Sequence, residues 1–160
     1  MEFIRGGPAI PPAFQTEKLV SWTESSESAA AFAGTARYSL FFDAPTPSAG
    51  GWMLDLGRVC DSARVKLNGT SLGTVILSPF QFRVDRLKPG RNVLKVEVTN
   101  VSANRVRDLD RRHIPWKVMC DINLVDIRYK PFDAANWPVR DAGLMGPVTL
   151  VPVRKGSLGE

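Results

Sequence analysis

The sequence predicts an all-β fold: an antiparallel β-sandwich of the jelly-roll type with one long irregular loop segment. Apolar and polar residues alternate over seven or eight short segments, which is the two-residue period of half-buried strands. Turn signals separate these segments at roughly ten-residue spacing. Glycine and proline contribute 13 and 12 of the 160 residues. Their combined share of about 16% exceeds the roughly 12% of an average protein. This composition favours many turns and short strands over long helices.

The length of 160 residues predicts one domain, since domains average about 100–200 residues. Residues 1–16 are rich in glycine and proline, and Pro11-Pro12 excludes a regular helix there. We therefore expect an extended N-terminal arm over residues 1–16, a β-sandwich domain over residues 17–154 and a C-terminal tail over residues 155–160.

The first strands are expected before residue 60. Residues 17–23 are predicted as a short strand that ends in Trp22, and residues 24–31 as a loop or a single helical turn. A clearer strand follows over residues 35–43, and another over residues 52–57. The apolar face of the clearer strand carries Ala36, Tyr38, Leu40 and Phe42.

The middle of the chain alternates in the same way. Strands are predicted over residues 62–67, 71–77, 80–84 and 93–99. Asn68-Gly69 joins the first two of these and is a strong hairpin signal. Trp52 and Phe82 each lie on an alternating strand face, so both are expected in the core.

The alternation is lost between Asn100 and Asp133. A short helix over residues 103–111 is predicted, followed by a long irregular stretch. A final strand is predicted over residues 146–153, after a Gly-Pro turn. A stretch of this length with little regular structure is usually functional or a docking surface.

The charge composition is basic but dispersed. The formal net charge is +5, from 21 Lys and Arg against 16 Asp and Glu, and the pI is near 9.6. The densest stretch, Arg105 to His113, mixes four arginines with two aspartates. No helix-turn-helix, zinc-finger or RNA-binding signature accompanies it. We expect no nucleic-acid partner, and interpret the arginines as suited to an anionic glycan or a partner domain.

No apolar run approaches the ~18 residues that a membrane-spanning helix needs, so no membrane partner is expected. Residues 1–8 lack the apolar core of a signal peptide. The sequence leaves the localisation open, with a secreted or periplasmic parent enzyme as one alternative.

The cysteines and the single histidine offer few metal ligands. Cys60 and Cys120 fit either one disulfide or two buried reduced thiols. Together with His113 they are too scattered for a structural zinc site, which needs about four ligands. The aspartate-containing loops between Asp108 and Asp141 leave a structural calcium ion open, although their spacing matches no EF-hand. No other cofactor is expected.

No catalytic motif is present, so no catalytic residue is predicted. His113 could serve as a base, but a lone histidine beside arginines is more often a surface residue. A carboxylate pair of the kind used by glycosidases could come from the aspartates in the second half of the chain. These are Asp108, Asp110, Asp121, Asp126, Asp133 and Asp141. Surface pairing with arginines is the simpler interpretation of them.

The aromatic residues of the irregular segment predict a carbohydrate site. Sugars stack their C–H faces on aromatic rings, and their hydroxyls need planar hydrogen-bonding partners. Trp116, Tyr129 and Trp137 would supply the rings. The polar partners would be Arg112, Arg128, Asp133, Asn136 and Arg140. The alternative is that these aromatic side chains only pack the long loop onto the sandwich.

Two sets of motifs carry a resemblance to known families. The first comprises Trp52-Met53-Leu54-Asp55-Leu56-Gly57, Leu67-Asn68-Gly69, Pro79-Phe80, Leu87-Lys88-Pro89-Gly90 and Val96-Glu97-Val98-Thr99-Asn100. It resembles the galactose-binding-like β-sandwich attached to many glycoside hydrolases, including the sugar-binding domain of family 2.

The second set spans nearly the whole chain. It comprises Gly6-Gly7-Pro8, Ser21-Trp22-Thr23, Gly34-Thr35-Ala36-Arg37-Tyr38, Ala103-Asn104-Arg105, Tyr129-Lys130-Pro131-Phe132 and Gly143-Leu144-Met145-Gly146-Pro147-Val148. It resembles the C-terminal sandwich of the large α-L-rhamnosidases of glycoside hydrolase family 106. The catalytic carboxylates of such enzymes lie in a separate barrel domain, so their activity transfers to no residue of this chain.

The resemblance implies a non-catalytic carbohydrate-binding or accessory module of a system that degrades plant polysaccharide. Its expected partners are a carbohydrate, in the form of a rhamnose-containing or pectin-like glycan, and a catalytic glycoside-hydrolase domain. Two alternatives stay open. One is a purely structural sandwich packed on a catalytic barrel, and the other is a small free-standing glycoside hydrolase that uses loop carboxylates.

Overall fold

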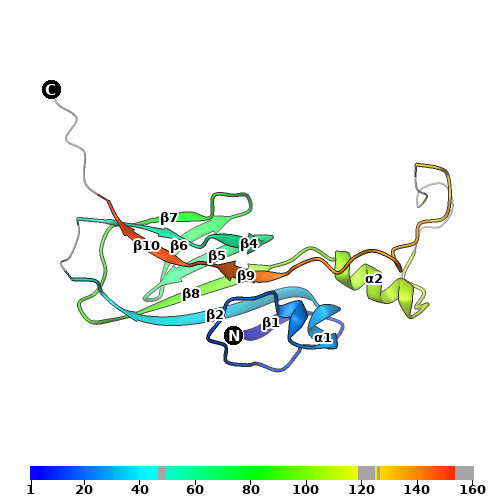
Figure 1. Ribbon diagram of the computed structural model, residues 1–160, viewed down its shortest axis with the longest axis horizontal. Helices are drawn as coiled ribbons and strands as arrows, with labels where there is room; N and C mark the ends of the chain where they lie inside the picture. The colour runs from blue at the N-terminus through cyan, green and yellow to red at the C-terminus, as the bar shows by residue number, and fades with distance from the viewer. Residues whose placement is uncertain (47–49, 119–124, 126, 154–160) are drawn as a thin grey trace.

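The computed structural model describes residues 1–46, 50–118, 125 and 127–153, and it shows an elongated β-sandwich with a helix and a long loop at one end (Figure 1). The strands are β1 (Glu2–Gly7), β2 (Ala33–Asp43), β3 (Trp52–Asp55), β4 (Arg58–Cys60), β5 (Ser62–Leu67), β6 (Thr70–Val75), β7 (Gln81–Val84), β8 (Arg91–Thr99), β9 (Gly143–Gly146) and β10 (Thr149–Pro152). The helices are η1 (Trp22–Glu24), α1 (Glu27–Ala30) and α2 (Ala103–Arg111).

The strands form one large sheet and two smaller ones. The large sheet has the order β1-β2-β8-β5-β6, and the smaller sheets have the orders β10-β3-β7 and β4-β9. All strand pairs are antiparallel. The predicted all-β sandwich is therefore confirmed.

The alternation in β2 and β8 builds the centre of the large sheet. The two strands pair over the whole length of β8, from Thr35 opposite Thr99 to Asp43 opposite Arg91. Successive strand side chains point to opposite faces, and Leu94, Val96 and Val98 are buried while their neighbours face outward.

The Asn68-Gly69 turn joins β5 to β6 as predicted. Both residues have positive φ, 51° and 89°, which is the conformation that an Asn-Gly hairpin turn requires. The Asn68 side chain also reaches β8: its Oδ1 accepts a hydrogen bond from Val93 N at 2.9 Å. The turn is thus fixed to the central strand.

The core lies between the large sheet and the smaller ones. Trp52 and Phe82 are both buried in it, as expected. A cluster of three aromatic rings extends this core at the α1 end. Phe3, Trp22 and Phe32 pack edge to face, with ring centroids 4.9 to 6.2 Å apart.

Two expectations for the N-terminal part are wrong. The first residues of the expected arm form β1, an edge strand paired with β2. The expected strand over residues 17–23 is absent, and Trp22 begins the short helix η1 instead. Ser21 explains this difference, because its Oγ accepts the Thr23 N–H at 3.4 Å and so caps the helix.

The predicted C-terminal strand over residues 146–153 also differs from the structure, which has two strands in this region, β9 and β10. Gly143–Gly146 pairs with β4, whereas Thr149–Pro152 pairs with β3. Pro147 lies between them and has no N–H to continue a ladder.

Helix α2 has the predicted bounds, and α1 is the expected single helical turn. The expected tail over residues 155–160 lies outside the described residues.

No helix in the described part of the chain is long and apolar enough to cross a membrane.

Candidate functional site

Helix α2 and the described residues between 112 and 142 lie beyond one end of the sandwich (Figure 1). Asn104, a buried residue of α2, joins the two ends of this segment. Its Nδ2 donates to the Arg140 carbonyl, and its Oδ1 accepts from Arg140 N, both at 2.8 Å. We call α2 together with the described residues of 112–142 the aromatic end.

Three aromatic rings pack together in this end. Phe132 lies between two tryptophans, with its centroid 6.1 Å from Trp116 and 5.4 Å from Trp137. Both contacts are edge to face, the arrangement that the ring quadrupoles favour. The Lys117 Nζ lies 5.5 Å from the ring centroids of both Trp116 and Phe132.

Asp110 holds this arrangement together. Its Oδ1 accepts the indole N–H of Trp116 and its Oδ2 accepts the Ala134 N–H, each at 2.7 Å. The Lys117 Nζ lies 3.3 Å from Oδ1, and the carboxylate side chain is 8% exposed. One carboxylate of α2 therefore fixes the Trp116 ring and the backbone of the returning loop.

The pKa of Asp110 reflects these contacts. Its burial raises the pKa and is the largest single influence, but the hydrogen bonds from Ala134, Trp116 and Lys117 together outweigh it. The pKa is therefore lowered from its ordinary value of 3.8. The carboxylate is charged at neutral pH, as a triple acceptor must be.

An open depression of about 540 Å³ lies beside Asp110. This volume lies within the range of small-molecule sites. One side is the Trp116 ring with Ile114 and Pro115, and the polar groups are Asp110, His113, Lys117 and Asp133. An apolar ring with polar groups around it is the combination that sugar binding requires.

The structure brings together only some of the residues that the sequence predicts for a sugar site. Trp116 and Asp133 line the depression. Trp137 packs behind Phe132, and its carbonyl accepts the Arg107 Nε–H at 2.6 Å. Asn136 is exposed beside it.

The other predicted residues do not line the depression. Arg112 pairs with Asp108 on α2, at 2.9 Å. Arg140 is fixed to Asn104 through its backbone. Arg128 is exposed, and Tyr129 is 84% exposed. These four residues are near Trp116 or Trp137 in sequence, but nearness in sequence does not specify where a loop returns.

Sequence reasoning missed the roles of Lys117 and Phe132, and considered Asp110 only as a candidate for a carboxylate pair. The signal for Asp110 was its place on the predicted helix, six residues before Trp116.

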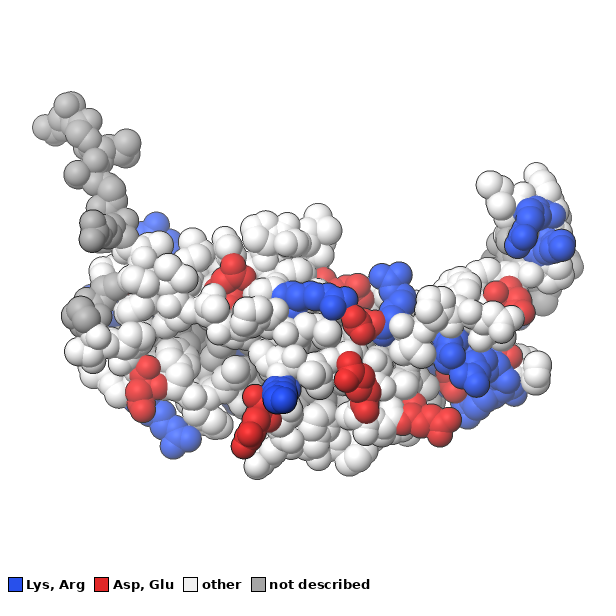
Figure 2. Space-filling view, in the orientation of Figure 1, with Lys and Arg blue, Asp and Glu red and all other residues white. Residues whose placement is uncertain are grey.

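Figure 2 shows Lys and Arg gathered over the α2 end, where Arg105 and Arg112 both pair with Asp108.

The aspartates considered for catalysis are engaged in structural contacts. Asp108 pairs with arginines, Asp141 lies 2.6 Å from Arg58, and Asp133 accepts the Ala135 N–H. Asp121 and Asp126 lie outside the described residues. Within the described ranges, no three His, Cys, Asp or Glu side chains are placed to hold a metal ion. The calcium site stays a prediction.

The Cys60 side chain is half-buried and forms no disulfide with a described residue, and burial is the main reason that the pKa of its thiol is raised. Cys120 lies outside the described residues. The question of a disulfide between the two therefore stays as the sequence left it.

Comparison with solved structures shows what the sandwich is similar to. The rhamnosidase from Novosphingobium sp. PP1Y superposes with a TM-score of 0.70 at 29% identity. The match covers 88% of this chain and 13% of that one. The chain resembles one domain of a glycoside hydrolase. The expected resemblance to a sandwich domain of glycoside hydrolases is thereby confirmed.

A relative and a second solved structure also match the chain. A relative from Formosa agariphila, whose name proposes a beta-glucuronidase, is 31% identical over 156 residues, covering 84% of this chain and 13% of that protein. A family 2 β-galacturonidase from Eisenbergiella tayi shares the fold at 22% identity, with a TM-score of 0.51 over 62% of this chain and 17% of that one. No family model matches the chain. This glycoside-hydrolase-like domain thus spans about an eighth of the first two proteins.

Proposed function

We propose that this domain is a non-catalytic accessory module that binds carbohydrate at the aromatic end. The observation that carries the proposal is the Trp116 ring, which is held by the Asp110 carboxylate at the wall of an open depression. A ring that is already fixed loses little conformational entropy when a sugar stacks on it. His113, Lys117 and Asp133 stand around the ring as hydrogen-bonding partners for hydroxyls.

The names of the similar proteins support a choice of glycan class. One is called a rhamnosidase and another a β-galacturonidase, and rhamnose and galacturonate occur together in pectin-like polysaccharides. We therefore propose a rhamnose-containing or pectin-like glycan as the ligand. The hydrolytic activity itself would belong to a separate catalytic domain.

Trp116→Ala is expected to weaken binding of a rhamnose-containing oligosaccharide by about tenfold or more, because it removes the stacking surface. Isothermal titration calorimetry against rhamnosides and galactosides measures this. Tyr129→Ala is the matched control, since Tyr129 lies outside the depression. A panel that stays silent at millimolar sugar, or a Trp116→Ala variant that binds like the parent, contradicts the proposal.

A second function is favoured by the exposed apolar side chains of the same segment. Val118 and Ile127 are each 96% exposed, and Ile114 and Val139 are also exposed. Apolar side chains gathered on one segment often mark an interface. Docking of the aromatic end against a catalytic domain would protect its amides from hydrogen exchange in the longer protein. Equal exchange in the isolated domain and in the longer protein would contradict docking.

A further inference from the structure

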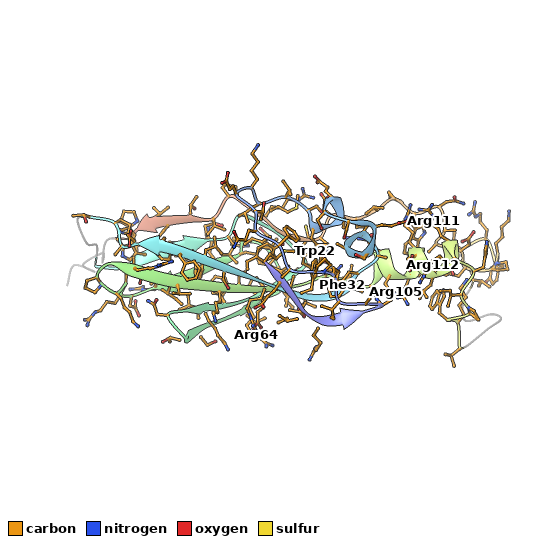
Figure 3. The ribbon with its side chains drawn as sticks, turned by 90° about the horizontal axis from the view of Figure 1, so that it is seen from below. Trp22, Phe32, Arg64, Arg105, Arg111 and Arg112 are labelled. Carbon is orange, nitrogen blue, oxygen red and sulfur yellow. The ribbon has the colours of Figure 1, made fainter. Side chains whose placement is uncertain are left out.

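The outward face of the large sheet carries an uneven distribution of charge. A depression of about 570 Å³ on this face is lined by five basic side chains and a single carboxylate, that of Glu97. The basic side chains are Arg37, Lys66, Lys88, Arg91 and Lys95. We call these five residues the basic face. Figure 3 shows Arg64 of the same sheet well apart from the labelled arginines of the aromatic end, so the sheet and the aromatic end are separate basic regions.

The strand register places like charges next to one another. Lys66 of β5 lies directly opposite Lys95 of β8, and like charges at directly opposed positions destabilise a sheet. Lys95 has Ser39 opposite it on its other side, in β2. Across the described ranges no ion pair is found for Lys66, Lys88 or Lys95. The sheet therefore keeps an arrangement that works against its own stability.

The carboxylates of this face lie at its margins. Glu97 is engaged by Arg37 at 2.7 Å and lies 3.9 Å from Arg64. Asp43 lies opposite Arg91 at the end of β2. Arg37 is also paired with Glu2 of β1 at 3.1 Å, so the uncompensated positive charge of this face is concentrated at the three lysines.

The turn that carries Lys88 is held in place. Asn92 is fully buried, and its Nδ2 donates to the carbonyls of Lys88 and Gly90, each at 2.9 Å. Its Oδ1 accepts from Lys88 N and from the Asn68 side chain, at 3.0 and 2.8 Å. One buried amide therefore fixes the Lys88 turn beside the β5–β6 hairpin, so the basic face is rigid at this end.

We propose that the basic face binds an acidic polysaccharide, a chain of uronate sugars, independently of the aromatic end. Neighbouring strands lie about 4.8 Å apart, so the sheet presents its cations at short, regular intervals. A chain with a carboxylate on each sugar offers a matching row of anions. This inference extends the carbohydrate-binding role proposed above, but it rests on different residues.

The same face is poorly suited to nucleic acid. Proteins that bind single strands stack the bases on exposed aromatic rings. None of the described residues that line this depression is aromatic. Phe41 of β2 lies outside the lining, and the Arg91 guanidinium lies 4.6 Å from its ring centroid. The observations therefore favour a ligand that needs charge and hydrogen bonds but no stacking surface.

Affinity electrophoresis and calorimetry with oligogalacturonate test the proposal, with the fully methyl-esterified oligomer as the uncharged control. We expect binding of the acid form alone, weakened by added salt as screened charges require. Lys66→Gln with Lys95→Gln is expected to weaken it about tenfold or more. Lys18→Gln with Arg83→Gln removes the same charge away from this face and should leave binding unchanged. Trp116→Ala should also leave it unchanged, which separates this site from the aromatic end.

A second variant, Lys95→Glu, distinguishes a loss of binding from a loss of folding. It places a carboxylate opposite Lys66, so we expect a melting temperature about 1–3 °C higher together with loss of oligogalacturonate binding. Three results would each overturn the proposal: no binding of the acid oligomer, equal binding of the ester, or unchanged affinity in the double lysine variant. Tighter binding of a single-stranded oligonucleotide than of oligogalacturonate would instead identify a nucleic-acid surface, and would overturn it too.

Discussion

Trp22→Ala is expected to lower the free energy of unfolding by about 3–5 kcal/mol, the range for a buried tryptophan replaced by alanine. Trp22 is 1% exposed and packs edge to face against Phe3 and Phe32. Its backbone N–H also donates to the Ala142 carbonyl at 3.0 Å. Trp22 thus contacts the first strand and the α1 region through its side chain, and the approach to β9 through its backbone. A loss of this size would consume much of the stability of a domain.

Urea denaturation of the variants measures this effect. Trp22→Phe should cost less than half as much, because a phenyl ring keeps most of the aromatic packing. The indole N–H of Trp22 has no hydrogen-bond partner among the described residues, so its removal adds no lost bond. Phe41→Ala, at a mostly exposed ring, is the control and should cost under about 1 kcal/mol. A Trp22→Ala loss as small as the control's would show that Trp22 is not part of the core.

The strands that alternate strictly could be predicted from the sequence because their pattern and their burial have the same cause. In β8, every second residue from Asn92 to Val98 is buried between the sheets. The Asn68-Gly69 turn is similar, since its backbone conformation restricts the residue types that fit. In such segments local preference and tertiary packing agree.

The elements that were missed depend on partners far away in the chain. Strand β1 contains Gly6, whose Cα faces Gly34 of β2 so closely that a Cβ on Gly34 would lie 2.1 Å from the Arg5 carbonyl oxygen. Glycine there permits close strand pairing, but in the sequence it suggests a flexible arm. Trp22 has the same difficulty, because its burial is decided by Phe3 and Phe32.

The candidate site also combines a feature that the local sequence predicts with contacts that depend on residues far away in the chain. Its aromatic ring, Trp116, could be identified from residue type and from its place in an irregular segment. The partners that fix it could not, since Asp110 acts through the Ala134 N–H, 24 residues later, where the loop returns. The basic face was equally hidden. Its charge is dispersed in sequence and becomes local only when the register places β5 beside β8.

Asp110→Ala is expected to destabilise the aromatic end by about 2–3 kcal/mol, because it leaves three donors without their charged acceptor. The Trp116 indole N–H, the Ala134 N–H and the Lys117 ammonium would all lose their contact with this carboxylate. Hydrogen exchange of the amides in α2 and residues 132–137 measures the loss locally, and weaker oligosaccharide binding should accompany it. The main sheets should keep their protection, since Asp110 lies outside the sandwich.

Lowering the pH tests the same Asp110 contacts without a substitution. The folded-state pKa of Asp110 is lowered from 3.8, so its stabilising contribution is fully present above that ordinary value. The contribution declines below it and is lost as the pH falls through the lowered pKa. The local protection of the parent, corrected for intrinsic exchange rates, should therefore fall in this acid range. Asp110→Asn keeps one acceptor but cannot ionise, so its protection should be lower at neutral pH and should change less on acidification. Identical acid profiles for the parent and Asp110→Asn would show that another group controls the order of this segment.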